Sequence, residues 1–301
     1  MAPTPSAIAA ALDTNTKAIY ATSITLPNLA VTDISALAAI AHSHGVPLVI
    51  DNSLCAAGYF LRPIAHGADI VLHDKTWLSG SSTTDAGVII DAGTFDWSAH
   101  GARFPEMVLP SPGYHGLVFW DKFGKGAFGA LARAVVMREF GGALSPFAAQ
   151  HVLVGMETLA LRAERRAWNA GVLSAWLQGL EGVGWVAYPG LEGREGFELA
   201  GRYLKRGFGA VLTFGVVGGA EMAEKVVRGF ELIGESADLD GSKTLAFHPW
   251  SSTHRGFGEE ERAASGLSED MIRLSVGTEH IDDLKHDITQ SIEKARKAVT
   301  A

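Results

Sequence analysis

The sequence predicts an α/β protein with a mainly parallel sheet in its first half and a smaller α+β domain in its second half. Short apolar strand candidates alternate with helical segments up to about residue 90, and a long helical stretch follows from Pro146. Strand and helix patterns then recur to the end of the chain. We therefore expect a large domain at 1–160 and a C-terminal small domain at 161–301. With 301 residues, 47% of them hydrophobic, the chain can bury both cores.

The first strand and helix follow from apolar patterning and helix signals. Residues 18–24 are β-branched and apolar, which predicts a strand. Thr32 or Asp33 is then expected to cap a helix, and Gly45 follows its end. The apolar residues of this helix recur at helical spacing and are Ile34, Leu37, Ala38 and Ala41.

Three further strand candidates complete the first half. Residues 48–50 form a short continuous apolar run, which is typical of a strand buried on both faces, and this run ends at Asp51. Residues 69–72 and 87–90 predict two more strands. The alternation of strands with helical pieces predicts a parallel sheet with right-handed crossovers.

The second half begins with a helical stretch at residues 146–180, which predicts one long helix or two consecutive ones. We expect Trp168, Leu173 and Leu177 to face the core of this stretch, and the charged residues Arg162, Glu164, Arg165 and Arg166 to face solvent. Strands at 185–188, 210–217 and 272–276 follow, with helices at 222–232 and 280–298. These elements predict the α+β domain.

The composition of the chain indicates which partners it can bind and in which compartment it is found. The net charge of −8 and a pI near 5.8 provide no basic surface for a phosphate backbone, so we expect no nucleic acid partner. The longest apolar stretch, residues 210–220, is about half of the roughly 20 residues that a membrane span needs. The single cysteine, Cys55, allows no internal disulfide. We expect a cytoplasmic protein with a small-molecule substrate and no membrane partner.

Ionisable residues follow two of the predicted strands. Asp51 ends one strand, and His73, Asp74 and Lys75 follow another. Ligands of open parallel sheets bind at such carboxyl ends. An aspartate and a lysine there can form a structural ion pair or a helix cap. They can also form a pyridoxal-phosphate (PLP) site, because PLP needs a lysine for its Schiff base and an aspartate to keep its pyridine nitrogen protonated. Spacing alone leaves both alternatives open, and we assign no residue to a metal.

Long motifs in the right order resemble the Cys/Met-metabolism family of PLP-dependent enzymes, near its O-acetylhomoserine sulfhydrylase and cystathionine γ-synthase members. The stretches include VTDISALAAIAHSHGVPLVIDNS, ALSPFAAQHVLVGMETLALRAER and IRLSVGTEHIDDL. The resemblance runs from about Thr16 to Ile292. It implies the PLP-dependent transferase fold of the aspartate aminotransferase superfamily (fold type I), a PLP cofactor and an oligomer.

The resemblance also implies roles for individual residues. Asp51 falls on the aspartate that pairs with the pyridine nitrogen. Arg273 falls on the arginine that holds the substrate α-carboxylate with its planar fork, although a salt bridge is the alternative. Thr84 matches a threonine after the lysine loop and is expected to contact the cofactor. Tyr114 belongs to a Tyr-His-Gly triplet of the sulfhydrylase branch, and we interpret it as structural or as a substrate contact.

The lysine loop departs from the family pattern. The family reads His-Ser-Ala-Thr-Lys-Trp, whereas this chain reads His73, Asp74, Lys75, Thr76 and Trp77, one residue shorter and with Thr and Lys exchanged. Aligned from Trp77, the Schiff-base position is Thr76, which we count among the cofactor contacts. A one-residue slip in extended backbone moves a side chain by about 3.4 Å and turns it to the other face. A carboxylate at Asp74 would repel the phosphate.

The chain resembles the last two-thirds of the longer family members. The part without a match carries their Gly-rich phosphate-binding turn, so the resemblance implies a divergent member with a truncated cofactor domain and poor PLP affinity. We also expect exposed apolar surface and an oligomer, formed from identical chains or with a full-length homologue.

Three functions stay open at this point. In the first, the remodelled pocket belongs to an enzyme that works without PLP on a small molecule, such as a specialised metabolite, with His73, Asp51, Asp74 and Lys75 as acid, base or binding groups. In the second, Lys75 carries PLP for γ- or β-elimination or replacement on an amino acid. In the third, the chain is a non-catalytic partner of a longer homologue.

Overall fold

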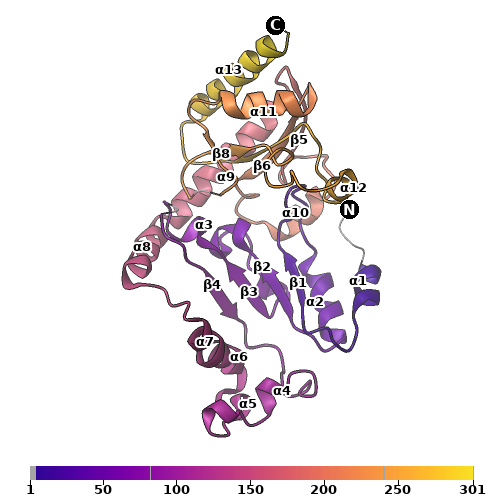
Figure 1. Ribbon diagram of the computed structural model, residues 1–301, viewed down its shortest axis with the longest axis vertical. Helices are drawn as coiled ribbons and strands as arrows, with labels where there is room; N and C mark the ends of the chain where they lie inside the picture. Colours follow the sequence, from indigo (N-terminus) through magenta and orange to yellow (C-terminus); the bar gives the residue numbers. More distant parts are fainter. Residues whose placement is uncertain (1–4, 82, 240, 301) are drawn as a thin grey trace.

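Two separate β-sheets organise the chain, one above the other in Figure 1. The computed structural model describes residues 5–81, 83–239 and 241–300. The first sheet has the strand order β1-β2-β3-β4, and the second has the order β5-β6-β9-β8-β7. Each sheet has its own buried apolar cluster.

The first sheet contains β1 (Ile19–Thr22), β2 (Leu48–Asp51), β3 (Ile70–His73) and β4 (Val88–Asp91). The first three strands are parallel, as predicted, but β4 is antiparallel to β3. Among the residues described between β3 and β4, the helix is α3 (Lys75–Leu78), which is four residues long. A parallel return needs a crossover of a dozen or more residues, usually a helix long enough to span the sheet, so this connection leads to an antiparallel strand instead.

The helix α2 (Ile34–Ser43) joins β1 to β2 and begins as predicted. The Asp33 carboxylate accepts a hydrogen bond of 3.2 Å from the Ala36 backbone N–H, which satisfies one donor of the first turn. Gly45 has a positive φ of 67° just beyond the end of the helix. The buried residues of α2 are the four predicted ones, Ile34, Leu37, Ala38 and Ala41.

Strand register decides which face of the first sheet each side chain occupies. Ile50 pairs with Val71, and Asp51 pairs with Leu72. Because side chains alternate between faces along a strand, Asp51 and Leu72 share one face, whereas Val71 and His73 lie on the opposite face. The two candidate site residues Asp51 and His73 therefore point away from each other across the sheet.

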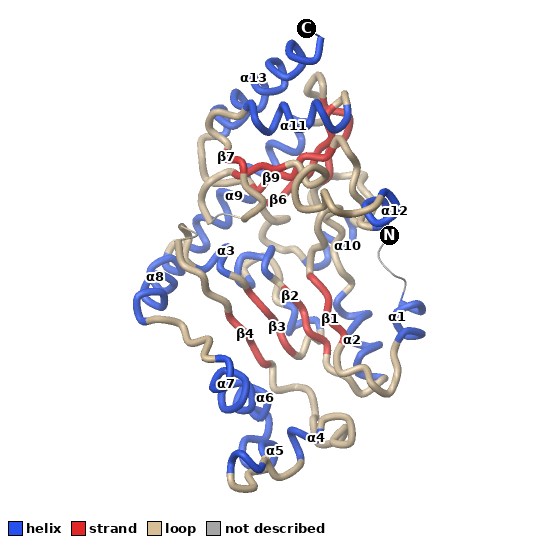
Figure 2. Tube along the Cα trace, in the orientation of Figure 1, coloured by secondary structure: helices blue, strands red, loops and turns tan. Residues whose placement is uncertain are grey.

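Short helical segments pack at the end of the first sheet that lies away from α3 (Figure 2). They are α4 (Pro105–Val108), η3 (Pro112–Tyr114), α5 (Phe119–Phe123), η4 (Gly124–Gly126), α6 (Ala127–Leu131), the π-helical η5 (Ala132–Met137) and α7 (Arg138–Phe140). Their aromatic core includes Phe95, Trp97 and Phe104. Two further 3-10 segments, η1 (Ser53–Gly58) and η2 (Pro63–His66), follow β2.

The predicted long helical stretch consists of two helices, α8 (Pro146–Glu157) and α9 (Leu159–Leu177). Leu173 and Leu177 are buried as expected, but the prediction was wrong for Trp168 and Arg166. Trp168 is 52% exposed, and Arg166 is 1% exposed. For Arg166 the reason is a distant polar partner. Its Nε donates a hydrogen bond of 2.7 Å to the Val276 carbonyl, just beyond β9, and helical periodicity cannot reveal such a partner.

The second sheet and its helices match the predicted α+β pattern. The strands are β5 (Val183–Ala187), β6 (Val211–Val216), β7 (Gly234–Glu235), β8 (Leu245–Phe247) and β9 (Met271–Ser275). The helices are α10 (Phe197–Tyr203), α11 (Gly219–Gly229), α12 (Glu259–Ala264) and α13 (Ile281–Thr300). The helices α11 and α13 pack against each other above this sheet (Figure 1).

The first helix, α1 (Pro5–Ala11), lies beside α2, and its Ile8 packs against the first core. Within the described part of the chain, none of the helices has both the length and the apolar character that a membrane crossing requires.

Candidate functional site

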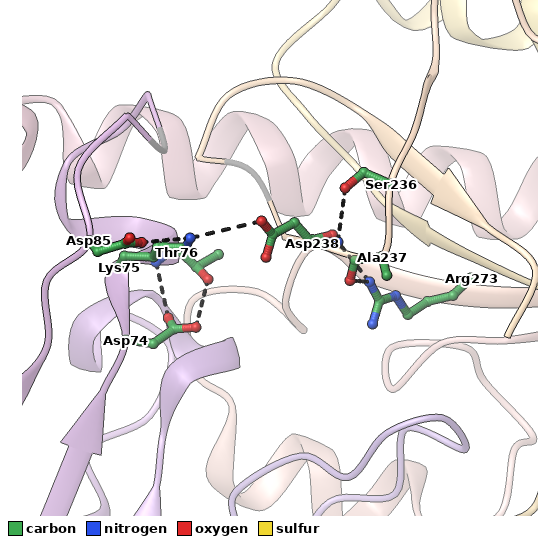
Figure 3. Close-up of polar contacts among 8 residues, drawn as sticks. All are labelled: Asp74, Lys75, Thr76, Asp85, Ser236, Ala237, Asp238 and Arg273. Atoms are coloured by element: carbon green, nitrogen blue, oxygen red, sulfur yellow. Dashed lines mark hydrogen bonds and ion pairs between the residues drawn. The ribbon is translucent and has the colours of Figure 1, made fainter. Parts of the chain in front are cut away.

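Lys75 lies at the end of β3 that faces the second sheet, in the first turn of α3. Its Nζ donates a hydrogen bond of 2.7 Å to Asp85 Oδ1 and lies 3.8 Å from Asp238 Oδ2 (Figure 3). The hydrogen bond to Asp85, followed by the charge of Asp238, raises the pKa of Lys75 above its usual value. The Lys75 side chain is therefore held as a protonated ammonium.

Asp74 and Thr76 bind each other on the other side of this turn. Asp74 is the N-cap of α3, and its Oδ1 accepts a hydrogen bond of 3.0 Å from the Thr76 backbone N–H. Its Oδ2 accepts a second bond of 2.9 Å from the Thr76 hydroxyl, which is buried (Figure 3). The Thr76 backbone N–H, a donor in the first turn of this short helix, is therefore already bound to a carboxylate.

Asp51 is connected to this turn through Ser53. Asp51 Oδ1 accepts hydrogen bonds from the Ser53 backbone N–H at 2.9 Å and from the Ser53 hydroxyl at 2.5 Å. The same hydroxyl oxygen accepts from the Asp74 backbone N–H at 3.1 Å. Asp51 Oδ2 accepts from the Tyr20 hydroxyl at 3.0 Å. The structure therefore brings Asp51, Asp74, Lys75 and Thr76 into one neighbourhood.

His73 belongs to a different environment. It is 7% exposed, its Nδ1 has no hydrogen-bond partner among the described residues, and it faces a cavity of about 560 Å³. Burial lowers the pKa of His73, although a backbone contact with Asn52 and the charges of Asp51 and Asp74 act in the opposite direction. The imidazole is therefore neutral near pH 7, and it faces away from the Asp51 side of the sheet.

Arg273 reaches the site from β9 in the second sheet. It is 8% exposed, and its Nη2 donates to the backbone carbonyls of Ala237 and Asp238, the latter at 3.1 Å (Figure 3). Its guanidinium carbon lies 4.0 Å from the centre of the Phe247 ring, and its Nε has no hydrogen-bond partner among the described residues. Burial lowers the pKa of Arg273 to about 10, so the guanidinium stays charged at neutral pH.

Among the described residues, the last two predicted site residues, Thr84 and Tyr114, have hydrogen-bond partners other than Lys75. The Thr84 hydroxyl is buried and lies 3.0 Å from His151 Nδ1. Tyr114 belongs to the segment between α4 and α5, which lies at the end of the first sheet away from α3 (Figure 1), and its hydroxyl donates to the Ala134 carbonyl. Arg138 lies over its ring at 4.8 Å. These contacts favour the structural interpretation of Tyr114.

Sequence reasoning missed Asp85 and Asp238. Asp85 follows Lys75 by ten residues in a turn without periodic pattern, so nothing local indicates the contact. Asp238 comes from a loop between β7 and β8, and only the packing of the two sheets brings it to Lys75. Its signal in the sequence is no more than an acidic residue in a polar loop.

Comparisons with known proteins agree with this architecture. The sequence model of the family described as Cys/Met metabolism PLP-dependent enzyme matches residues 2–293. The chain is 51% identical to the sulfhydrylase FUB7 of Fusarium oxysporum f. sp. lycopersici, covering 95% of this chain and 66% of the relative. It is 45% identical to the homocysteine synthase of Schizosaccharomyces pombe, covering 97% of this chain and 68% of the relative.

The fold is similar to that of a solved O-acetylhomoserine (thiol)-lyase from Campylobacter jejuni, which carries a pyridoxyl-lysine phosphate. The TM-score is 0.91 at 32% identity, covering 96% of this chain and 68% of that one. The architecture is therefore the α/β fold of type I PLP-dependent enzymes. The chain spans about two thirds of the length of the relatives it matches. Its homologues are sulfhydrylases and homocysteine synthases, and the chain belongs to the Cys/Met metabolism family of PLP-dependent enzymes.

Proposed function

We propose that this chain uses the sulfhydrylase scaffold to bind a small carboxylate-bearing molecule without a PLP cofactor on Lys75. The observation that carries this proposal is the position of the Lys75 ammonium between the carboxylates of Asp85 and Asp238. A lysine must lose its proton before it can attack an aldehyde, and both carboxylates favour the protonated form. Lys75 then acts as a fixed cation and hydrogen-bond donor.

The groups around Lys75 fit a tethered PLP poorly. Asp74 places its negative charge at the start of α3, where it would repel a phosphate. Thr76, at the Schiff-base position that the family resemblance implies, has no amine, and its hydroxyl is bound to Asp74. Asp51, at the end of β2, is the carboxylate that the family resemblance assigns to the pyridine nitrogen of PLP. The proposal therefore routes no chemical step through this cofactor.

Arg273 is the proposed anchor for the carboxylate of the substrate. A planar guanidinium binds a carboxylate through two parallel hydrogen bonds, and the unpartnered Nε of Arg273 is one of the donors available for them. For Nη2 to donate the second of these hydrogen bonds, the carbonyls of Ala237 and Asp238 must give up their own bonds to it. Asp51, Asp74 and Lys75 are the proposed acid, base and binding groups beyond it.

PLP-dependent sulfhydrylase chemistry is the second candidate, because a relative that is 51% identical carries the name sulfhydrylase. In that case Lys75 would leave Asp85 to carry PLP, and Arg273 would hold the α-carboxylate of an amino acid substrate. We further propose a cytoplasmic location, which the single and buried Cys55 supports.

The deciding experiment titrates the purified chain with PLP and then reduces it with borohydride. We expect no absorption band of an internal aldimine at about 420 nm. After reduction, we expect no pyridoxyl group on the peptide that contains Lys75. The variants Lys75→Ala and Lys122→Ala form a matched pair, since Lys122 is an exposed lysine elsewhere. A band that Lys75→Ala abolishes and Lys122→Ala retains would refute the proposal and support the second candidate.

A further inference from the structure

A second site lies on the face of the first sheet that is opposite to Asp51. The cavity of about 560 Å³ that His73 faces is also lined by Val71 and Ile90, which are paired in the register of β3 and β4. Asp51 pairs with Leu72 instead, so its side chain points to the other face. The cavity is therefore separate from the Lys75 and Arg273 neighbourhood, and its size is in the usual range for small-molecule sites.

The charged groups of this cavity have one sign. Arg62 and Arg206 line it, both are exposed, and no acidic side chain is among its lining residues. Within the residues that the structure describes, neither guanidinium forms an ion pair. Arg206 lies over the Tyr59 ring at 5.1 Å, which holds it at the wall. The opening therefore attracts an anionic group.

Apart from Arg62, Arg206 and Tyr59, the cavity lining is mostly apolar and contains one imidazole. Val71, Ile90 and Leu159 supply apolar surface, whereas His73 supplies an imidazole. Its Nδ1 is buried and has no hydrogen-bond partner among the described residues. Buried polar atoms nearly always find a partner, so this nitrogen indicates a neutral donor or acceptor from a bound molecule. Because burial keeps the imidazole neutral, the charge of that molecule belongs beside the two arginines.

We propose that this cavity binds a small amphipathic carboxylate. Its anionic end contacts Arg62 and Arg206, its flat apolar body lies against Val71, Ile90 and Leu159, and a neutral hydrogen-bonding group at its far end meets His73 Nδ1. Each part of this ligand class corresponds to a group on the cavity wall. The proposal is independent of the function proposed above, because none of Lys75, Asp238 and Arg273 lines the cavity.

The test uses isothermal titration calorimetry with three probes of the same shape. They are para-hydroxyphenylpropionate, its amide, which lacks the charge, and phenylpropionate, which lacks the hydroxyl. We expect the hydroxy-acid to bind most tightly. Loss of the charge should weaken binding about tenfold or more, and loss of the hydroxyl should weaken it by about threefold to tenfold.

Variants assign these differences to side chains. The double variant Arg62→Gln and Arg206→Gln should remove the preference for acid over amide, and His73→Phe should remove the preference for the hydroxyl. Arg228→Gln is the matched control, since this exposed arginine lies on α11. Thermal melts of each variant check that the fold is retained, and the comparison among probes on the unaltered chain tests the proposal without any variant.

Three results would overturn the proposal: no binding of the hydroxy-acid, equal binding of acid and amide, or loss of binding in Lys75→Ala. The last result would place the probe at Lys75 and Arg273 instead. Absence of PLP binding leaves this test unaffected, so failure of the two proposals can be told apart.

Discussion

Lys75 and Arg273 contact the same residue from opposite sides. The Asp238 carboxylate lies 3.8 Å from Lys75 Nζ, and the Asp238 carbonyl accepts a hydrogen bond of 3.1 Å from Arg273 Nη2. One residue of a loop in the second sheet therefore connects an amine of the first sheet to a buried guanidinium of the second. A movement of this loop would change the surroundings of both cations together.

Removal of either acidic partner should lower the pKa of Lys75. Asp85→Asn should have the larger effect, because the hydrogen bond that Lys75 donates to Asp85 contributes most to raising that pKa, and Asp238→Asn should have a smaller one. The pH dependence of Lys75 acetylation, followed by mass spectrometry, measures this change. We expect labelling of Lys75 to begin at lower pH in both variants. An unchanged pH profile, identical to that of the exposed control Asp121→Asn, would contradict this assignment.

Asp287 should stabilise the second sheet in a pH-dependent way. Burial alone would raise the pKa of Asp287, but hydrogen bonds from the backbone N–H groups of residues 231, 232 and 233, at 2.8 to 3.0 Å, lower it below 3.8. Its contribution is therefore present above pH 3.8 and is lost as the pH falls through the lowered value. Asp287→Asn should cost about 2 kcal/mol in urea unfolding at pH 7.

Asp287→Asn should also make the free energy of unfolding fall less steeply as the pH is lowered below 3.8. Asp283→Asn is the matched control, because Asp283 is exposed on the same helix. If both variants lost stability equally at every pH, the effect would come from the helix and not from the backbone contacts of Asp287.

Arg166 should hold the two sheets together. Its guanidinium lies 4.1 Å from the centre of the Trp77 ring in α3, and its Nε donates to the Val276 carbonyl beyond β9. Arg166→Met should cost about 2–4 kcal/mol, because the buried carbonyl loses its donor and the stacking is lost. Chemical unfolding monitored by tryptophan fluorescence measures this cost. Arg228→Met, on an exposed face, should stay within about 0.5 kcal/mol of the unaltered chain.

The surface around α8 predicts self-association. Phe147 is 78% exposed, and Phe140, Leu153 and Leu161 are also mostly exposed. Exposed large apolar side chains on consecutive helices are typical of an interface between subunits. Light scattering should give a mass above the 31.8 kDa of one chain, and Phe147→Ser with Leu153→Ser should reduce it. A monodisperse species of 31.8 kDa would exclude this interface.

Much of the fold could be predicted because its signals are local. Asp33 and Gly45 mark the ends of α2 through capping and left-handed backbone, and both are short-range chemistry. The direction of β4 was not predictable from apolar patterning, since a strand has the same alternation in either direction. The direction follows from the length of α3, because a four-residue helix is too short for the crossover that a parallel strand needs.

The site was harder to predict because its contacts join distant segments. The sequence placed Asp51, Asp74 and Lys75 correctly at strand ends, but it grouped His73 with them, and register puts His73 on the other face. Arg166 was assigned to solvent because its polar partner, Val276, lies 110 residues away. Such partners are set by tertiary packing, which no local pattern encodes.

The pairing of Asp74 with Thr76 also determines what a lysine placed at position 76 would meet. A Thr76→Lys substitution would bring a long cationic side chain into a buried turn beside Trp77, with the carboxylate of Asp74 as its immediate neighbour. That carboxylate would form an ion pair with the new ammonium, as Asp85 does with Lys75. A lysine at position 76 would therefore stay a bound cation beside Asp74 unless that carboxylate were replaced as well.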